Sequence, residues 1–303
     1  MNGVNIGVIG AGLMGHGIGY LLAAAGHTVR IYDPSTQWRE TLNERMESAR
    51  ALLNGDPALL RRISAHDQLA PAMKDVAFVF EAAPEKLPLK QQLFAELENL
   101  TSPDTILASN SSAIPTTLIG EKLKHRDRVV GTHFWNPPHL VPLVEVIQNE
   151  KTSDDTVAKT MTLLRDAGRN PVHVKKDIPG FVGNRLQHAL KREAIALVAS
   201  GVCDADTIDE VVKSGFGARM AVLGPMEQTD LVGVDLTLDI QNMVLADLDR
   251  STEPTQFIKD KVAAGKLGMR TGEGFRKWTP QSADAVRERL RNFLVAQAKA
   301  ART

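Results

Sequence analysis

A glycine-rich turn near the N-terminus restricts the possible folds more than any other feature of the sequence. Gly10, Gly12 and Gly15 form the segment Gly-Ala-Gly-Leu-Met-Gly, which matches the pattern G-x-G-x-x-G. It follows a short apolar run, Val4–Ile9, and precedes a segment with a helical pattern, Leu13–Ala25. The first glycine permits a tight turn, the second lets a pyrophosphate approach the backbone, and the third brings helix and strand together. The turn therefore predicts a strand–turn–helix unit that binds a dinucleotide.

The residues around this turn indicate which dinucleotide would bind. The start of the helix, at Leu13 and Met14, offers free backbone N–H groups and a positive dipole to the phosphates. A second apolar run, Thr28–Tyr32, ends in Asp33, where such folds place the acid that binds the ribose. This carboxylate would accept hydrogen bonds from the ribose hydroxyls and repel a 2′-phosphate. We therefore expect NAD rather than NADP, the alternative being that Asp33 is an ordinary turn residue before Pro34.

Strand-like and helical segments alternate through the first 180 residues. The remaining strand candidates are short apolar runs at 76–81, 105–108, 129–131 and 144–147. Helical patterns cover 38–60, where the charges are mainly arginines, and 89–100. This alternation predicts an α/β protein with a doubly wound, mostly parallel Rossmann-type sheet.

The pattern changes after Pro179-Gly180, where helical segments follow one another without comparable strands. Helices are expected at 184–200, 204–214, 229–248, 255–264 and 282–301. We therefore predict an NAD-binding domain over residues 1–180 and a smaller, all-helical substrate and dimerisation domain over residues 181–303.

The composition excludes several classes of protein. The chain of 303 residues is 43% hydrophobic and 24% charged, which is usual for a globular protein. Its formal net charge of zero gives no basic field for nucleic acid or a membrane surface. A single cysteine, Cys203, excludes an internal disulfide and a cysteine-rich metal site, so no metal is expected. With no signal peptide or membrane-spanning run apparent, we expect a cytoplasmic protein.

One histidine stands out as a candidate catalytic group. Hydride transfer to or from a secondary alcohol requires a group that exchanges the hydroxyl proton, and histidine is the usual choice. Of eight histidines, His133 and His139 lie in an unusual segment, 131–145. His133 is expected to follow a strand directly, at the ligand-binding edge of the sheet. Glu145 ends another apolar run and would orient the imidazole. Spacing does not show that the two meet, and a structural histidine remains the alternative.

The same segment resembles a known family. The run Thr-His-Phe-Trp-Asn-Pro-Pro at 132–138, with Glu145 twelve positions after His133, is similar to the signature of the L-3-hydroxyacyl-CoA dehydrogenases. The resemblance extends nearly from end to end of the chain. It includes the segments 108–112, 179–185, 224–235 and 266–275.

The resemblance implies catalytic roles for four residues. His133 would be the general base and Glu145 its partner, while Ser112 and Asn184 would bind the substrate oxygens near the reacting carbon. Ser112 and Asn184 each have an alternative role as the N-cap of a helix. The resemblance also implies a homodimer that forms through the helical domain.

The resemblance further implies cofactor contacts outside the glycine turn. Glu85, Lys90 and Asn136 would contact NAD. Arg270 stands where the family usually has lysine, so a cationic cofactor contact is retained. Glu85 and Lys90 could instead be a solvated pair, and Arg270 a basic residue without a special role.

Several features depart from the acyl-CoA members of the family. Those members carry a long, lysine-rich helical pair after the second strand, whereas the span here is shorter and its cations are mainly arginines. Gly183 stands where a β-branched residue is common. The segments 136–139 and 217–224 look closer to branches that act on small free hydroxy acids. These branches are the L-gulonate 3-dehydrogenase/lambda-crystallin group, the carnitine dehydrogenases and a pyridoxine-degradation dehydrogenase.

Three hypotheses about function follow. The first is reversible NAD-dependent oxidation of a secondary 3-hydroxyl in a 3-hydroxyacyl-CoA such as 3-hydroxybutyryl-CoA, as in fatty acid metabolism. The second replaces the thioester with a free acid of the gulonate, carnitine or pyridine-carboxylate type. The third is a non-catalytic NAD-binding or structural protein. Arg39, Arg45 and Arg50 bear on the first two hypotheses, because they would form either a CoA-phosphate patch or a solvated helix face.

Overall fold

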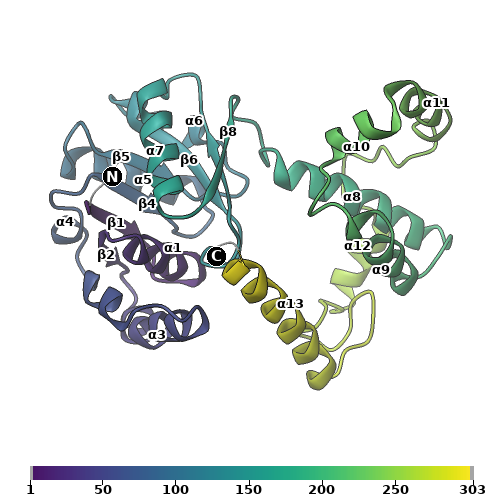
Figure 1. The fold of residues 1–303 in the computed structure, drawn as a ribbon, viewed down its shortest axis with the longest axis horizontal. Coiled ribbons are helices and arrows are strands. Elements are labelled where there is room, and N and C mark those ends of the chain that lie inside the picture. The colour runs from purple at the N-terminus through teal and green to yellow at the C-terminus, as the bar shows by residue number, and fades with distance from the viewer. Residues whose placement is uncertain (1–2, 301–303) are drawn as a thin grey trace. The chain divides into compact units, whose positions relative to one another are not determined.

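An eight-stranded sheet organises the N-terminal part of the chain in the computed structural model, which describes residues 3–300 (Figure 1). Its spatial order is β3-β2-β1-β4-β5-β6-β7-β8, and all neighbours are parallel except β6 and β7. The strands are β1 (Asn5–Ile9), β2 (Thr28–Tyr32), β3 (Ile63–His66), β4 (Phe78–Glu81), β5 (Ile106–Ser109), β6 (Val129–Phe134), β7 (Leu143–Ile147) and β8 (Asn170–Val174). The chain leaves β1 in one direction and returns on its other side at β4. The crevice at the carboxyl ends of β1 and β4 is therefore the point where such folds bind ligands.

Helices cover both faces of this sheet. They are α1 (Leu13–Ala24), α2 (Thr36–Glu40), α3 (Leu42–Leu52), α4 (Leu69–Ala72), α5 (Leu87–Leu100), α6 (Thr116–Ile119) and α7 (Asp154–Asp166), with 3₁₀ turns η1 (Pro57–Arg62) and η2 (Arg126–Arg128). Helices α1, α3 and α7 bury their apolar residues on one face, and α4, α5 and α6 do so on the other. The Rossmann-type α/β class expected from the sequence is confirmed.

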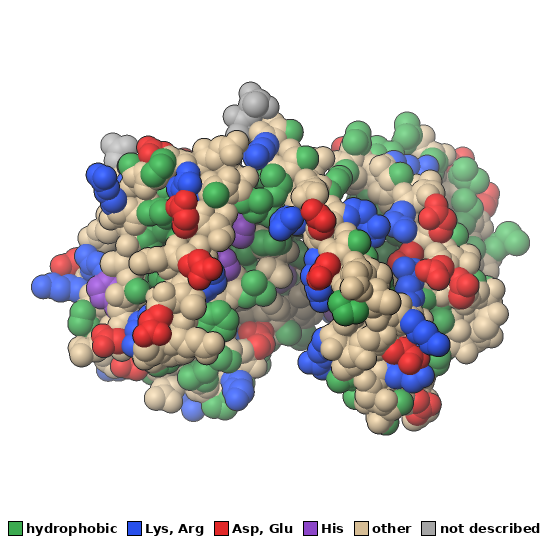
Figure 2. All heavy atoms as spheres, turned by 90° about the horizontal axis from the view of Figure 1, so that it is seen from below, with side chains coloured by type: hydrophobic (Ala, Val, Ile, Leu, Met, Phe, Trp, Pro, Cys, Tyr) green, Lys and Arg blue, Asp and Glu red, His purple; other side chains and the backbone are tan. Residues whose placement is uncertain are grey.

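The rest of the chain is helical. It contains α8 (Gly183–Ala199), α9 (Ala205–Ser214), η3 (Phe216–Ala218), α10 (Pro225–Val232), α11 (Val234–Val244), α12 (Gln256–Ala263) and α13 (Pro280–Ala300). Two compact units result: the chain up to Asn184 together with the part from Leu290 onward, and Arg185–Arg289. Charged side chains of both signs are interspersed over the face in Figure 2, and hydrophobic side chains reach the surface between them.

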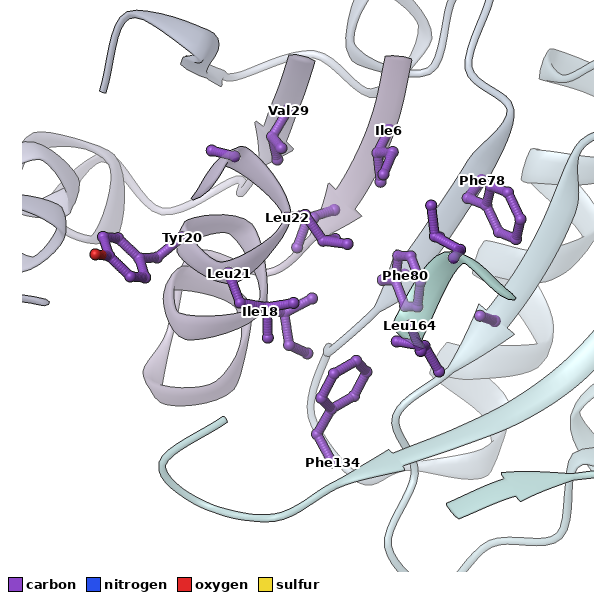
Figure 3. Packing of buried hydrophobic residues seen from close by; sticks show 14 of the residues in the cluster. Ile6, Ile18, Tyr20, Leu21, Leu22, Val29, Phe78, Phe80, Phe134 and Leu164 are labelled. Carbon is purple, nitrogen blue, oxygen red and sulfur yellow. The ribbon is translucent and has the colours of Figure 1, made fainter. Parts of the chain in front are cut away.

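The core of the first unit follows the alternation of side chains along its strands. Phe78 and Phe80 face one side of the sheet with Ile18 of α1, whereas Val79 faces the other side with Phe94 of α5. Figure 3 shows part of the first cluster, with Ile18, Leu21 and Leu22 of α1 on one side and Phe78, Phe80 and Phe134 on the other. At about 25 cal/mol per Å² of apolar surface, this two-sided burial is the main stabilising contribution to the sheet.

The structure differs from the expected elements in several places. One helix was expected at 229–248, but Gly233, with φ of 100°, separates α10 from α11. The expected helix over 38–60 is divided into α2, α3 and η1. Strands β3 and β8 and helix α7 were not expected at all. The division at residue 180 also placed the whole of 181–303 in one domain, whereas the chain from Leu290 groups with the first unit. Leu294, Val295 and Ala298 pack there against its core.

Candidate active site

The three glycines of the turn have different surroundings. Gly10 has φ of 94°, and a Cβ there would lie 2.7 Å from the carbonyl oxygen of Ala82. A Cβ on Gly15 would lie 1.7 Å from the carbonyl oxygen of Gly10. A Cβ on Gly12 would meet no atom within 4 Å, and no side chain caps the helix that starts there. Gly10 and Gly15 therefore serve the fold, whereas Gly12 leaves open space in front of the N-terminus of α1, beside Leu13 and Met14.

Asp33 lies directly after β2, with its carboxylate turned to the glycine turn. Its Oδ2 accepts a hydrogen bond of 2.7 Å from the backbone N–H of Ala11, and its Oδ1 accepts one of 2.8 Å from Ser35. The residue is 7% exposed. A carboxylate can accept about four hydrogen bonds, so acceptor capacity remains for ribose hydroxyls. Asp33 therefore also fixes the turn, which an ordinary residue before Pro34 would not do.

The arginines that follow β2 bind the protein's own backbone and side chains. Arg39 donates to the carbonyl oxygens of Asp33 and Pro34 at 2.7 and 2.9 Å. Arg45 donates to the carbonyl oxygens of Ala11 and, at 2.6 Å, of Trp38, and lies over the Trp38 ring. Arg50 is paired with Glu47 at 2.8 and 2.6 Å and donates to the carbonyl oxygen of Gly55. These guanidinium groups hold α2 and α3 against the glycine turn and their own loops.

His133 and Glu145 meet directly across two strands. The sequence suggested that His133 follows a strand, but the residue lies inside β6. The antiparallel register places it opposite Glu145 of β7. The His133 Nδ1 to Glu145 Oε2 distance is 2.7 Å, and both residues are buried. Because an ionised carboxylate only accepts, Nδ1 carries the proton in this pair and Nε2 is left as the basic nitrogen.

Glu145 also holds the segment that leads into α8. Its Oε1 accepts hydrogen bonds of 2.9 Å from the backbone N–H groups of both Val182 and Gly183. Burial raises the pKa of Glu145, but hydrogen bonds from His133, Gly183 and Val182 outweigh burial and bring the pKa below its usual value. The carboxylate is therefore ionised at neutral pH, and it connects the histidine to the residue before Asn184.

Aromatic rings enclose the imidazole. The ring centroids of Trp135 and Phe181 lie 5.4 and 5.6 Å from that of His133. A Cβ on Gly183 would lie 2.4 Å from Cζ2 of Trp135. The indole thus occupies the space that a side chain at position 183 would need. A β-branched residue at position 183 would therefore clash with Trp135 in this structure.

Ser112 and Asn184 come together although they belong to different motifs. The side-chain amide of Asn184 donates a hydrogen bond of 2.9 Å to the carbonyl oxygen of Ser112. Ser112 is exposed and lies in the loop after β5, where the N-cap of α6 is Pro115. The geometry therefore excludes a capping role for Ser112. The residue lies beyond the carboxyl end of β5, at the same edge of the sheet as the end of β6 that carries His133.

Lys90 forms a buried ion pair with Glu81, and Glu85, whose side chain is 40% exposed, lies at the outer end of this network, so Glu85 and Lys90 are not a fully solvated pair. The ammonium of Lys90, whose side chain is 1% exposed, lies 2.6 Å from Glu81 Oε1 and 3.4 Å from Glu85 Oε2. Glu81 is fully buried and accepts further hydrogen bonds of 2.7 Å from the Ser109 hydroxyl and the Ala83 N–H. Direct contacts of Glu85 and Lys90 with NAD remain predictions.

Two more predicted cofactor contacts lie on the surface. Asn136 is exposed in the segment between β6 and β7, and Arg270 is exposed in the second unit. Their roles remain predictions. Sequence reasoning missed Glu81 and Asn110, whose Oδ1 accepts a hydrogen bond of 2.9 Å from the Phe134 N–H. The signal for Glu81 was a charged residue that ends an otherwise apolar central strand.

Residues 3–300 contain neither a metal-binding cluster of side chains nor a membrane-spanning helix. No group of three or more histidine, cysteine, aspartate and glutamate side chains in this range is arranged to hold a metal ion. Within the same range, no helix combines the length and apolar character needed to span a membrane.

The fold and the nucleotide-binding turn define an NAD-dependent oxidoreductase of the Rossmann class. Two family descriptions match the chain: 3-hydroxyacyl-CoA dehydrogenase, NAD binding domain, over residues 5–178, and the C-terminal domain of the same family over residues 180–278. The protein therefore belongs to the 3-hydroxyacyl-CoA dehydrogenase family, whose named relatives are NAD-dependent dehydrogenases acting on CH–OH groups. The open space at Gly12, the uncapped helix and the Asp33 carboxylate fit NAD.

Individual relatives point to different substrates. The chain is 36% identical over 297 residues to a 5-formyl-3-hydroxy-2-methylpyridine 4-carboxylate 5-dehydrogenase of Mesorhizobium japonicum, covering 96% of both chains. A solved structure of such an enzyme, described as an NAD⁺-dependent dismutase, superposes with a TM-score of 0.92 at 35% identity and covers 99% of both chains. The structure of (S)-3-hydroxybutyryl-CoA dehydrogenase from Ralstonia eutropha gives a TM-score of 0.76 at 30% identity, covering 91% and 99%.

Proposed function

We propose that the protein uses NAD to oxidise a CH–OH group of a small free carboxylate, with His133 as the general base. Nε2 of His133 takes the proton of the hydroxyl group. NAD, held at the glycine turn and by Asp33, would supply the acceptor for the hydride that leaves the carbon bearing this hydroxyl. Glu145 holds the other nitrogen at 2.7 Å and stabilises the imidazolium that forms. The Ser112 hydroxyl and the Asn184 amide hold the substrate oxygen next to His133.

The positions of the three arginines support a substrate without CoA. A CoA thioester brings several phosphate charges, which need free cations for recognition. Arg39, Arg45 and Arg50 lie in α2 and α3, after β2, and each donates to carbonyl oxygens of the protein. Releasing one of them would leave partly buried acceptors without donors. The proposal rests on these hydrogen bonds, because they engage the three arginines within the protein.

The comparisons support the same class of substrate. The Mesorhizobium relative is named for an aromatic carboxylate that bears a formyl group. The hydrate of an aldehyde also presents a CH–OH group, so a base placed like His133 serves an alcohol and a hydrated aldehyde alike. Beside His133, the indole of Trp135 fills the space that a larger residue at position 183 would need.

A panel of substrates tests the proposal. NADH formation would be followed at saturating NAD with 3-hydroxybutyryl-CoA, L-carnitine, L-gulonate and 5-formyl-3-hydroxy-2-methylpyridine 4-carboxylate. We expect the highest kcat/KM with one of the free acids. A highest value with the CoA thioester would overturn the choice of substrate class, and tight NAD binding without turnover of any compound would favour a non-catalytic protein.

We also propose that the second unit pairs with a second copy of the chain. Among the described residues of α8 to α12, no side chain is fully buried. On α11, Leu238 is 58% exposed and Met243 is 83% exposed. A helical unit that buries so little apolar surface needs another surface to cover it.

Sedimentation velocity tests this pairing. We expect the unmodified chain to sediment as a dimer and Leu238→Glu with Met243→Glu to shift it toward the monomer. Leu118→Glu, which changes an exposed leucine of the first unit, is the control and should leave the dimer intact. A monomer for the unmodified chain would contradict the proposal.

A further inference from the structure

The loop that carries Ser112 is held by one carboxylate oxygen. Glu85 Oε1 accepts a hydrogen bond of 2.6 Å from the Ser111 hydroxyl and bonds of 3.0, 3.0 and 3.4 Å from the backbone N–H groups of Ser112, Ala113 and Ile114. Successive N–H groups that converge in this way form a concave site for an anion. Here the anion is a side chain that lies 26 to 29 residues earlier in the sequence.

The network behind Glu85 keeps this carboxylate charged. Burial raises the pKa of Glu85, but hydrogen bonds from Ser111, Ala113 and Ser112 and the charge of Lys90 bring the pKa below its usual value. Lys90 is itself fixed, because Glu81 lies 2.6 Å from its ammonium on the buried side. Glu81, Lys90 and Glu85 thus form a chain from the end of β4 to the loop after β5.

The arrangement parallels that at Glu145. Glu145 accepts two successive backbone N–H groups just before Asn184, and Glu85 accepts three that begin at Ser112. The hydrogen bond from Asn184 to the Ser112 carbonyl then joins the two segments. Each of the two residues proposed to hold the substrate oxygen is therefore anchored through its backbone by a carboxylate.

We propose that Glu85 is a positioning residue for Ser112, acting through the loop 111–114 and supported by Lys90 and Glu81. Its Oε1 is occupied by the loop, so the main effect of Glu85 is on the placement of the Ser112 hydroxyl at the reacting carbon. The inference rests on the role proposed above for Ser112. It gives Glu85 a function in turnover that is separate from any contact with NAD.

A double-mutant cycle tests this inference. Glu85→Ala leaves Lys90 paired with Glu81, and Ser112 and Ala113 are exposed, so water can replace the lost acceptor and the fold should persist. We expect kcat to fall by roughly 10–100-fold, as for a group displaced by about 1 Å. In a Ser112→Ala background the same substitution should have little further effect, because Glu85 acts through Ser112. Glu85→Gln, which retains an acceptor oxygen, should recover part of the activity.

A matched control comes from the same helix as Lys90. Glu98 also accepts backbone N–H groups of a loop, those of Lys124 and His125 at 2.9 and 2.8 Å, but this loop leads into the start of β6, whereas His133 lies near its end. Glu98→Ala should lower the melting temperature while kcat stays unchanged. The affinity for NAD, measured by protein fluorescence quenching, should stay within about twofold of the unmodified value in Glu85→Ala.

The outcomes separate the two proposals. If Ser112→Ala alone leaves kcat unchanged, the role proposed for Ser112 is wrong and the inference about Glu85 falls with it. If Ser112→Ala lowers kcat but the effects of the two substitutions on kcat multiply, Glu85 does not act through Ser112. A loss of NAD affinity at unchanged kcat would make Glu85 a cofactor contact and overturn the inference. Should Glu85→Ala not fold, Glu85→Gln takes its place in the same cycle.

Discussion

The Asn184 side-chain amide donates a 2.9 Å hydrogen bond to the carbonyl oxygen of Ser112, 72 residues earlier in the chain. Asn184 follows Gly183, whose N–H binds Glu145, and Glu145 binds His133. One continuous set of hydrogen bonds therefore connects the proposed base to both residues proposed to hold the substrate oxygen. This connection gives each of them a defined orientation before substrate binds.

Asn184→Ala should lower kcat/KM by roughly 10–100-fold, the usual effect of losing one or two hydrogen bonds in the transition state. Steady-state rates of NADH formation measure it. Asn99→Ala is the control, since Asn99 likewise donates its amide to a carbonyl oxygen, that of Ala95, but on the exposed side of α5. Equal rates for Asn184→Ala and the unmodified protein would show that Asn184 is a structural residue only.

Gly12 and Gly15 should separate cofactor binding from stability. A Cβ on Gly12 meets no protein atom, so Gly12→Ala should change the free energy of unfolding by less than about 0.5 kcal/mol while NAD affinity falls. A Cβ on Gly15 would lie 1.7 Å from the Gly10 carbonyl, so Gly15→Ala should cost about 1–3 kcal/mol or more. Urea unfolding and NAD titration of both variants check this. Unchanged NAD affinity in Gly12→Ala would place the pyrophosphate elsewhere.

The local part of the nucleotide site was predictable because it depends on neighbours in sequence. Gly10 and Gly12 are two residues apart, and Asp33 comes directly after β2, the element that follows α1. A short apolar run followed by glycine and a helical pattern permits few other structures. The position of His133 opposite Glu145 was not predictable, because it depends on the antiparallel register of β6 and β7 and periodicity does not specify which strands pair.

The sequence likewise did not predict which groups the charged side chains contact. A lysine on a helix is usually exposed, yet the side chain of Lys90 is buried and its ammonium contacts Glu81. Arg45 reaches the carbonyl oxygen of Ala11, 34 residues earlier. Such pairings follow from the packing of α3 and α5 against the sheet, which sets where a long side chain ends. The break at Gly233 was missed because one glycine inside an apolar helical pattern is often tolerated.

Stability should decrease in mild acid because of buried neutral histidines. Burial, followed by the nearby His16 and Arg169, lowers the pKa of His139 from 6.5 to about 4. The folded state thus disfavours the charged ring, so this contribution is complete above pH 6.5 and is lost as pH falls toward 4. The shift corresponds to about 3 kcal/mol for a single group.

Urea unfolding between pH 7 and pH 4.5 measures this effect. His139→Phe should flatten the decline in the free energy of unfolding, whereas His173→Phe, at an exposed position of β8, should not. An equally steep decline in His139→Phe would show that other groups cause the acid sensitivity.

The role of His133 as general base is most directly tested by His133→Asn beside His173→Asn, with NADH absorbance at saturating NAD and the best substrate of the panel. His173 lies on β8 next to β7 and bonds to Gln148 at 2.8 Å, so it is a matched histidine outside the site. We predict that His133→Asn lowers kcat by roughly 10²–10⁴-fold with NAD affinity little changed, while His173→Asn keeps full activity. Near-full activity in His133→Asn would contradict the proposed mechanism.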